Sequence, residues 1–162
     1  LMNATIRRLE PLEYVHLNEF LYYAIFNPDG DNPLPFSIIQ QPELQVYIKN
    51  FGEELDDYAL CAQLSGGNIV GICWIRKMSG YGTIDASIPE LSISVKPGFQ
   101  GKGIGRYLLR SMLEAMRNLG YSYVSLSVDK SNRAYSWYLS EGFKQVEDKN
   151  GTCILVYSFK SI

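Results

Sequence analysis

The sequence has little of what several kinds of catalytic and metal site require. It contains one histidine, His16, and three cysteines. With one histidine, a histidine-built metal site is nearly excluded, and a Ser/His/Asp triad could be built only around His16. The cysteines, Cys61, Cys73 and Cys153, are far apart in apolar runs and form no CxxC, so we expect buried reduced thiols. We expect no metal, and the acid and base of any reaction must come from tyrosine, aspartate, glutamate or water.

Long apolar runs and an excess of positive charge are also absent. No apolar stretch approaches the roughly 20 residues of a membrane helix, and no secretory signal opens the chain, so we expect a cytoplasmic protein. The net charge of -2 gives no general bias toward nucleic acid or anionic lipid, and we expect neither as a partner. A length of 162 residues, 46% of them apolar, predicts one domain over residues 1–162.

Hydrophobic periodicity predicts a mixed α/β (α+β) fold. Alternating or continuous apolar runs predict strands, and apolar stripes at helical spacing predict helices. The predicted strands are 5–9, 57–64, 68–78, 90–95, 123–128, 144–148 and 152–159. The predicted helices are 11–26, 42–51, 104–119 and 132–141. We therefore expect a central, mostly antiparallel mixed sheet of about seven strands, flanked by about four helices.

Four glycines, Gly98, Gly101, Gly103 and Gly105, lie within eight residues directly before a predicted helix. Glycine is costly inside helices and strands, so this cluster indicates a tight turn or a closely approaching ligand. A strand that enters a helix through such a turn directs several backbone N–H groups toward one spot, which favours phosphate. The Walker pattern fails because Ile104 follows Gly103, and the dinucleotide fingerprint fails on its glycine spacing and on the missing acid.

Two motifs together resemble the GNAT superfamily of acyl-CoA-dependent N-acetyltransferases. "VKPGFQGKGIG" fits [QR]xxGx[GA] after a strand ending V-x-P, and "NRAYSWYLSEGF" fits N-x-A-x-x-[LW]-Y-x-x-x-G-F about 27 residues beyond Gly105. The order of the predicted elements is similar to that of the family as well. The resemblance implies a GNAT-like fold, an N-acetyltransferase activity with acetyl-CoA as cosubstrate, and a small-molecule or peptide amine as acceptor. It is also compatible with a homodimer.

The resemblance also implies which residues hold coenzyme A. The glycine loop would bind the pyrophosphate, and the N–H groups of the preceding strand would pair with the pantetheine arm and polarise the acetyl carbonyl. Asn132 would contact the cofactor, cap the helix that follows it, or do both. A neutral amide, Gln100, stands where the family more often has arginine. The expected cofactor-binding residues are Ile93, Ser94, Val95, Gln100, Gly101, Lys102, Gly103, Ile104, Gly105, Arg106 and Asn132.

Tyr138 and Glu90 are the candidate catalytic residues. Deprotonating an alkyl amine with a pKa of about 10.4 costs about 4 kcal/mol at about pH 7.4, so a base or a desolvating pocket is useful. Glu90, just before the glycine loop, is the best-placed base, directly or through a water, although it also fits a structural role at the strand end. Tyr138, whose phenol is protonated at neutral pH, is the preferred general acid for the departing thiolate; its alternative role is a core aromatic.

The charges and aromatic side chains are unevenly distributed. Five bases against one acid from Lys96 to Arg117 suit polyanionic coenzyme A. Seven acids against one lysine from Asn27 to Tyr58 would attract a cationic amine, or form only a solvated face. Aromatic residues that could line an acceptor pocket or belong to the core are Tyr14, Phe20, Tyr22, Tyr23, Phe26 and Trp74.

Two other classes of function stay open at this point. A non-catalytic acyl-CoA sensor or scaffold would keep the cofactor loop without turnover. A nucleic-acid-binding module would need a basic surface broader than the loop and helix that coenzyme A already explains.

Overall fold

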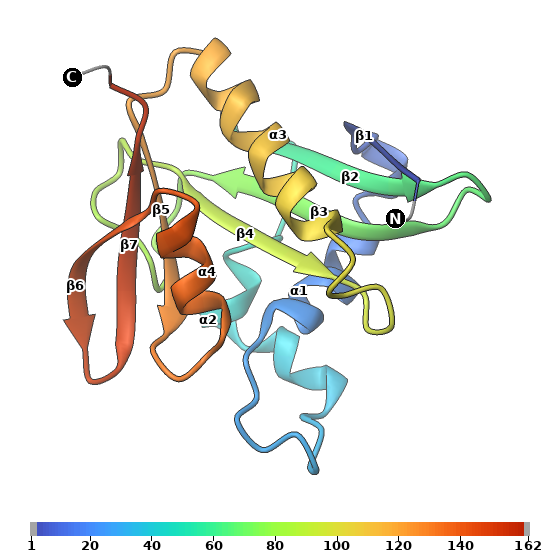
Figure 1. Ribbon diagram of the computed structural model, residues 1–162, viewed down its shortest axis with the longest axis horizontal. Helices are drawn as coiled ribbons and strands as arrows, with labels where there is room; N and C mark the ends of the chain where they lie inside the picture. The colour runs from blue at the N-terminus through green and yellow to red at the C-terminus, as the bar shows by residue number, and fades with distance from the viewer. Residues whose placement is uncertain (1–2, 161–162) are drawn as a thin grey trace.

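The computed structural model describes residues 3–160, in which seven strands form one sheet (Figure 1). The strands are β1 (Ala4–Arg8), β2 (Tyr58–Leu64), β3 (Ile69–Arg76), β4 (Glu90–Val95), β5 (Tyr123–Asp129), β6 (Lys144–Lys149) and β7 (Thr152–Ser158). Their order across the sheet is β1-β2-β3-β4-β5-β7-β6. Every neighbouring pair is antiparallel except β4 and β5, which are parallel. The expected mixed, mostly antiparallel sheet is confirmed.

Helices cover both faces of this sheet. Figure 1 shows α3 (Ile104–Asn118) and α4 (Ala134–Ser140) on the face toward the viewer, with α1 (His16–Ala24) and α2 (Pro42–Gln45) behind. Two short 3-10 turns, η1 (Pro11–Glu13) and η2 (Phe36–Gln40), complete the set. The predicted apolar stripe of α3 is confirmed for Ile104, Leu108, Met112 and Met116, which are at most 3% exposed, but not for its last member, Leu119, which follows the helix and is 58% exposed. Two apolar clusters result, one on each face of the sheet.

The helix predicted over 42–51 was wrong in length, since α2 ends at Gln45. Side chains of β3 explain the early end. The indole of Trp74 donates to the carbonyl of Tyr47 at 3.1 Å, and the Arg76 guanidinium donates to the carbonyls of Val46 and Lys49 at 3.1 and 2.7 Å. The carbonyls of Val46 and Tyr47 are acceptors that a helix through Phe51 would use for its own N–H groups. The predicted helix 11–26 is likewise divided, into η1 and α1, and ends where Ile25 becomes extended.

The three cysteines are free and buried, as the sequence predicted. Within residues 3–160, no group of three or more histidine, cysteine, aspartate or glutamate side chains is arranged to hold a metal ion. None of the helices in that range combines the length and the apolar character needed to cross a membrane.

The centre of the sheet contains a wedge-shaped opening between β4 and β5. These two strands share a single parallel pairing, between Glu90 and Ser125, and the N–H of Ser125 donates to the carbonyl of Pro89 at 3.1 Å. Beyond that point each strand is held only by its outer neighbour, β4 by β3 and β5 by β7. Figure 1 shows the two strands diverging. The backbone of β4 after Glu90 therefore has one side free of strand partners.

Candidate functional site

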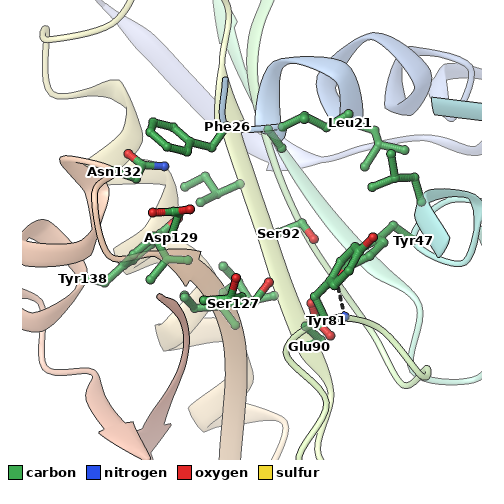
Figure 2. A pocket seen from close by; sticks show the side chains of 18 of the residues that line it. Leu21, Phe26, Tyr47, Tyr81, Glu90, Ser92, Ser127, Asp129, Asn132 and Tyr138 are labelled. Carbon is green, nitrogen blue, oxygen red and sulfur yellow. Dashed lines mark hydrogen bonds between the residues drawn. The ribbon is translucent and has the colours of Figure 1, made fainter. Parts of the chain in front are cut away.

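The wedge between β4 and β5 opens into a cavity of about 390 Å³ (Figure 2). The two strands contribute its walls, the segment from α1 through Tyr47 closes one side, and α4 with the loop before it closes the other. Its lining therefore comes from helices on both faces of the sheet, α1 and α2 on one face and α4 on the other (Figure 1). The lining residues are Leu21, Ala24, Ile25, Phe26, Ile38, Gln41, Leu44, Tyr47, Tyr81, Glu90, Leu91, Ser92, Ile93, Leu126, Ser127, Val128, Asp129, Asn132, Tyr138 and Thr152.

Two backbone N–H groups of β4 point into this wedge. The backbone N–H of Lys96 donates to the carbonyl of Val70 in β3 at 2.8 Å, and successive N–H groups along a strand point to opposite sides of it. The N–H of Ser94 therefore faces β3, whereas those of Ile93 and Val95 face the wedge. The side chain of Ser94 has a separate role, because its hydroxyl donates to the carbonyl of Phe20 at 2.7 Å and ties α1 to the sheet.

The glycine loop leaves a row of backbone donors unpaired at the start of α3. Gly101 and Gly103 have φ of +73° and +86°, values that L side chains rarely adopt. Within residues 3–160, the N–H groups of residues 100–106 donate no hydrogen bond. The side-chain amide of Gln100 donates to the carbonyl of Val95 at 3.0 Å and thereby joins the loop to the end of β4. The loop thus combines free donors with the positive end of a 15-residue helix, a combination that suits an anion.

Glu90 is a buried carboxylate at the narrow end of the wedge, 2% exposed. It accepts hydrogen bonds from the Tyr47 hydroxyl at 2.5 Å, from the Gly82 N–H at 3.0 Å and from the Thr83 hydroxyl at 3.4 Å. Burial raises the pKa of Glu90 to about 7, and the three hydrogen bonds lower it without cancelling the effect of burial. At neutral pH this carboxylate can therefore both accept and release a proton.

The segment between β3 and β4 holds the Glu90 side chain in position. The N–H of Tyr81 donates to the Tyr47 hydroxyl at 2.9 Å, and the two tyrosine rings stack with centroids 6.5 Å apart. A Cβ at Gly82 would lie 2.7 Å from the backbone of Leu126 and Ser127. The segment can therefore approach β5 this closely only with glycine at position 82.

Tyr138 reaches the cavity from α4. Tyr138 is 9% exposed, and its ring packs against Trp137 and Phe143 at centroid distances of 5.0 and 5.7 Å. Burial raises the pKa of the Tyr138 phenol above its usual value of 10, so the phenol keeps its proton throughout the neutral range. On the same side of the cavity, Asn132 accepts a hydrogen bond from the N–H of Ala134, the first residue of α4, at 2.9 Å, but the N-cap position of this helix is Arg133 and not Asn132.

Sequence reasoning missed a second carboxylate in the cavity, Asp129 at the end of β5. It accepts hydrogen bonds from the N–H and the hydroxyl of Ser131, at 2.8 and 2.7 Å, and these bonds lower its pKa. Two carboxylates with oppositely shifted pKa values thus share one cavity (Figure 2). The sequence signal that could have indicated Asp129 was its position directly after the predicted strand 123–128, because side chains at strand ends gather at one edge of a sheet. Nothing in the sequence indicated Tyr47.

The acids predicted to attract an amine lie elsewhere. None of the seven acids in the segment 27–58 lines the cavity, which takes only apolar and uncharged polar side chains from there. Asp57 pairs instead with the buried Arg76 at 2.8 Å, and Asp56 pairs with Lys77 at 3.3 Å. The aromatic residues divide as well: Phe26 lines the cavity, whereas Phe20 and Trp74 belong to the core.

Comparison with known proteins identifies relatives of this chain. Residues 56–145, more than half of it, match the family model described as an acetyltransferase (GNAT) domain. The chain is 35% identical to N-alpha-acetyltransferase RimI of Mycobacterium tuberculosis over 82 residues, which are 51% of this chain and 49% of that protein. It is 32% identical to mycothiol acetyltransferase of Propionibacterium freudenreichii over 93 residues, 57% of this chain and 29% of that protein. The chain therefore spans half or less of the length of these curated relatives.

A solved structure shares the fold over almost the whole chain. The PaiA N-acetyltransferase of Thermoplasma acidophilum, in complex with coenzyme A, superposes with a TM-score of 0.70 at 22% identity. The match covers 97% of this chain and 99% of that one. At this identity the likeness shows a shared fold.

Proposed function

This chain belongs to the GNAT acetyltransferase family, and we propose that it is an N-acetyltransferase that moves an acetyl group from acetyl-CoA to a primary amine by direct attack on the thioester. The observation that supports the proposal is the cavity between β4 and β5, whose lining includes Glu90, Tyr138 and Ile93 of the strand that leads to the glycine loop. This arrangement supplies what acetyl transfer needs: a proton acceptor, a proton donor and an anion-binding loop.

Several of the chain's own groups suit coenzyme A. The free N–H groups of residues 100–106 suit a pyrophosphate, with the exposed Lys102 and Arg106 side chains adding positive charge. The N–H groups of Ile93 and Val95 suit the amide groups of the pantetheine arm and the acetyl carbonyl. When acetyl-CoA is bound it supplies an acetyl thioester, the electrophile of the reaction.

Glu90 is proposed as the base. An amine that enters from the α1 and α2 side arrives as an ammonium ion and must lose a proton before it can attack. A carboxylate with a pKa of about 7 accepts that proton, directly or through a water, and returns it to solvent at neutral pH. Tyr47 and Gly82 hold the two carboxylate oxygens in place by their hydrogen bonds.

Tyr138 is proposed as the general acid. It lines the cavity from α4, on the opposite side of the wedge from the helices that bound the amine side. The leaving thiolate needs a proton, and the phenol is protonated at every pH at which the base is active. The proposed proton acceptor and proton donor thus line different sides of the same cavity (Figure 2).

A pair of matched glycine variants tests the cofactor site. Gly103→Ala and Gly120→Ala both place a side chain at a positive φ, +86° and +88°, with open space around the new Cβ. They lie just before and just after α3. Both should lose about 1 kcal/mol of stability, but only Gly103→Ala should raise the KM for acetyl-CoA, by about tenfold. Equal effects of the two variants on that KM would remove the loop from the site.

The non-catalytic sensor is separated from the enzyme by thiol release. The protein is mixed with acetyl-CoA and a panel of amines that contains alkyl amines, aralkylamines, amino acids and peptides, and free thiol is followed with time. Amine-dependent release supports the transferase. Calorimetric binding of acetyl-CoA without release for any acceptor would replace it with the sensor.

A further inference from the structure

The amine side of the cavity carries negative charge without any positive partner. Glu90 lines it, and the lining of the whole cavity, as drawn from residues 3–160, adds a second carboxylate, Asp129, near Asn132 and Tyr138 (Figure 2), and contains no lysine, arginine or histidine. The lowered pKa of Asp129 keeps that carboxylate ionised at neutral pH. An ammonium ion is therefore attracted, whereas an anionic group carried beside the amine would meet like charge and find no cation to pair with.

The same side is otherwise lined mostly by apolar side chains, with Gln41 and the Tyr47 hydroxyl as uncharged polar groups. The end of α1 and the residues that follow it contribute Leu21, Ala24, Ile25 and Phe26, and Figure 2 shows Leu21 and Phe26 at its border. Ile38 and Leu44 continue this surface from η2 and α2. An apolar surface of this kind gains free energy by covering hydrocarbon.

A pair of stacked aromatic rings completes the apolar side. Tyr47 is 6% exposed, and Tyr81, stacked on it, is 50% exposed. The hydroxyl of Tyr47 is engaged by Glu90 and by the N–H of Tyr81, so its ring is fixed in orientation. The exposed ring of Tyr81 is connected to Glu90 through Tyr47, on which it stacks and whose hydroxyl donates to the carboxylate. A flat hydrocarbon group joined to the amine by a short chain can stack there while its nitrogen stays near Glu90.

We propose that the acceptor is a small primary amine with an aromatic or other apolar body and no anionic group beside the nitrogen, of the aralkylamine type. This inference rests on the proposed function, since it names the substrate class of the same site. It excludes free amino acids, whose carboxylate lies two bonds from the amine. The volume of about 390 Å³ suits a small molecule together with the reactive end of the cofactor.

A set of four acceptors isolates the contribution of each chemical group. 2-Phenylethylamine and phenylalanine differ only in the carboxylate; phenylalaninamide restores its bulk without its charge; ethylamine lacks the ring. Rates are measured as kcat/KM by thiol release at saturating acetyl-CoA, with a hexapeptide that has a free N-terminus as a fifth acceptor.

The expected order follows from charge and burial. 2-Phenylethylamine should exceed phenylalanine by about 100-fold, because the cavity lining offers the carboxylate of phenylalanine no cation and places it near Glu90. Phenylalaninamide should recover most of that loss, and ethylamine should be slower than 2-phenylethylamine by about 30-fold for want of the buried ring.

Three results would overturn this inference while the proposed function stands. They are equal rates for phenylalanine and 2-phenylethylamine, equal rates for ethylamine and 2-phenylethylamine, and a hexapeptide faster than both. The absence of thiol release with every acceptor would instead remove the proposed function, and the inference with it.

Two tyrosine variants test where the ring binds. Tyr81 and Tyr107 are similarly exposed, at 50% and 53%, but Tyr107 lies on α3, outside the cavity lining. Tyr81→Ala should lower the ratio of kcat/KM for 2-phenylethylamine to that for ethylamine by about tenfold, and Tyr107→Ala should leave the ratio unchanged. The ratio cancels any change in cofactor binding. An unchanged ratio in Tyr81→Ala, or the same fall in both variants, would show that the substrate ring does not bind against Tyr81.

Discussion

The hydrogen bond from Tyr47 to Glu90 lowers the pKa of the proposed base, so removing it should shift the pH dependence of the proposed reaction. Tyr47→Phe keeps the ring and removes the hydroxyl that donates to the carboxylate at 2.5 Å. That bond lowers the pKa of Glu90, whereas burial raises it to about 7. A hydrogen bond to a charged group contributes about 1.5 to 3 kcal/mol, and one pKa unit corresponds to about 1.4 kcal/mol. The pKa of Glu90 should therefore rise by about one to two units, to between about 8 and 9.

The assay is kcat/KM for the amine from pH 5.5 to 9.5, by thiol release at saturating acetyl-CoA. The ratio of variant to wild-type kcat/KM is used because the ionisation of the free amine cancels in it. Only the ionised form of Glu90 accepts a proton, so below both pKa values the variant should be about 10- to 100-fold slower. Toward pH 9.5 the two enzymes should converge, since Glu90 is then largely ionised in both.

The control is Tyr81→Phe, which removes a hydroxyl that is not bonded to Glu90 and keeps the stacked ring. Its ratio to wild type should be constant with pH. A ratio that is also constant for Tyr47→Phe, or that falls as pH rises, would show that Glu90 is not the group whose ionisation controls the rate.

The remaining predictions concern the two candidate catalytic residues. The native pKa of Glu90, about 7, is above its ordinary value of 4.5, so the stability present below pH 4.5 is lost as pH rises through 7. In Glu90→Gln the side chain at position 90 does not titrate, so the variant does not lose this stability as pH rises. Its free energy of unfolding relative to wild type should therefore increase by up to about 3 kcal/mol between about pH 4.5 and 8; denaturant titration showing no such trend would contradict the raised pKa. Tyr138→Phe should lower turnover much more than it weakens acetyl-CoA binding, measured by steady-state kinetics and calorimetry. Equal loss of both, or loss of neither, would refute the general acid.

The elements that depend on local pattern could be predicted from the sequence. Strands such as β4 were found because side chains alternate between the two faces of a strand, and α3 because its apolar residues recur every three or four positions. The glycines at 101 and 103 indicated a special backbone, and their positive φ confirms it. The family followed from two motifs, each contained in a short stretch of chain, and it is confirmed.

Several expectations stay predictions. They are the cytoplasmic location, the homodimer, a single domain over residues 1–162, and the individual roles of the predicted site residues. Each depends on a compartment, a partner or a bound molecule, and none of these is contained in the fold of one chain.

Contacts between distant segments decided the rest. Tyr47 and Glu90 are 43 residues apart, and only packing of α2 and its following turns against the sheet brings them to 2.5 Å. The wedge exists because β4 and β5 pair at one residue only and then follow different neighbours. The pKa of Glu90 depends on burial by those segments. By itself, the sequence determined most of the elements, the glycine loop and the family, because neighbouring residues encode them. Only the tertiary structure decided the cavity and its charge, because burial and electrostatic interactions act between residues that the chain order does not relate.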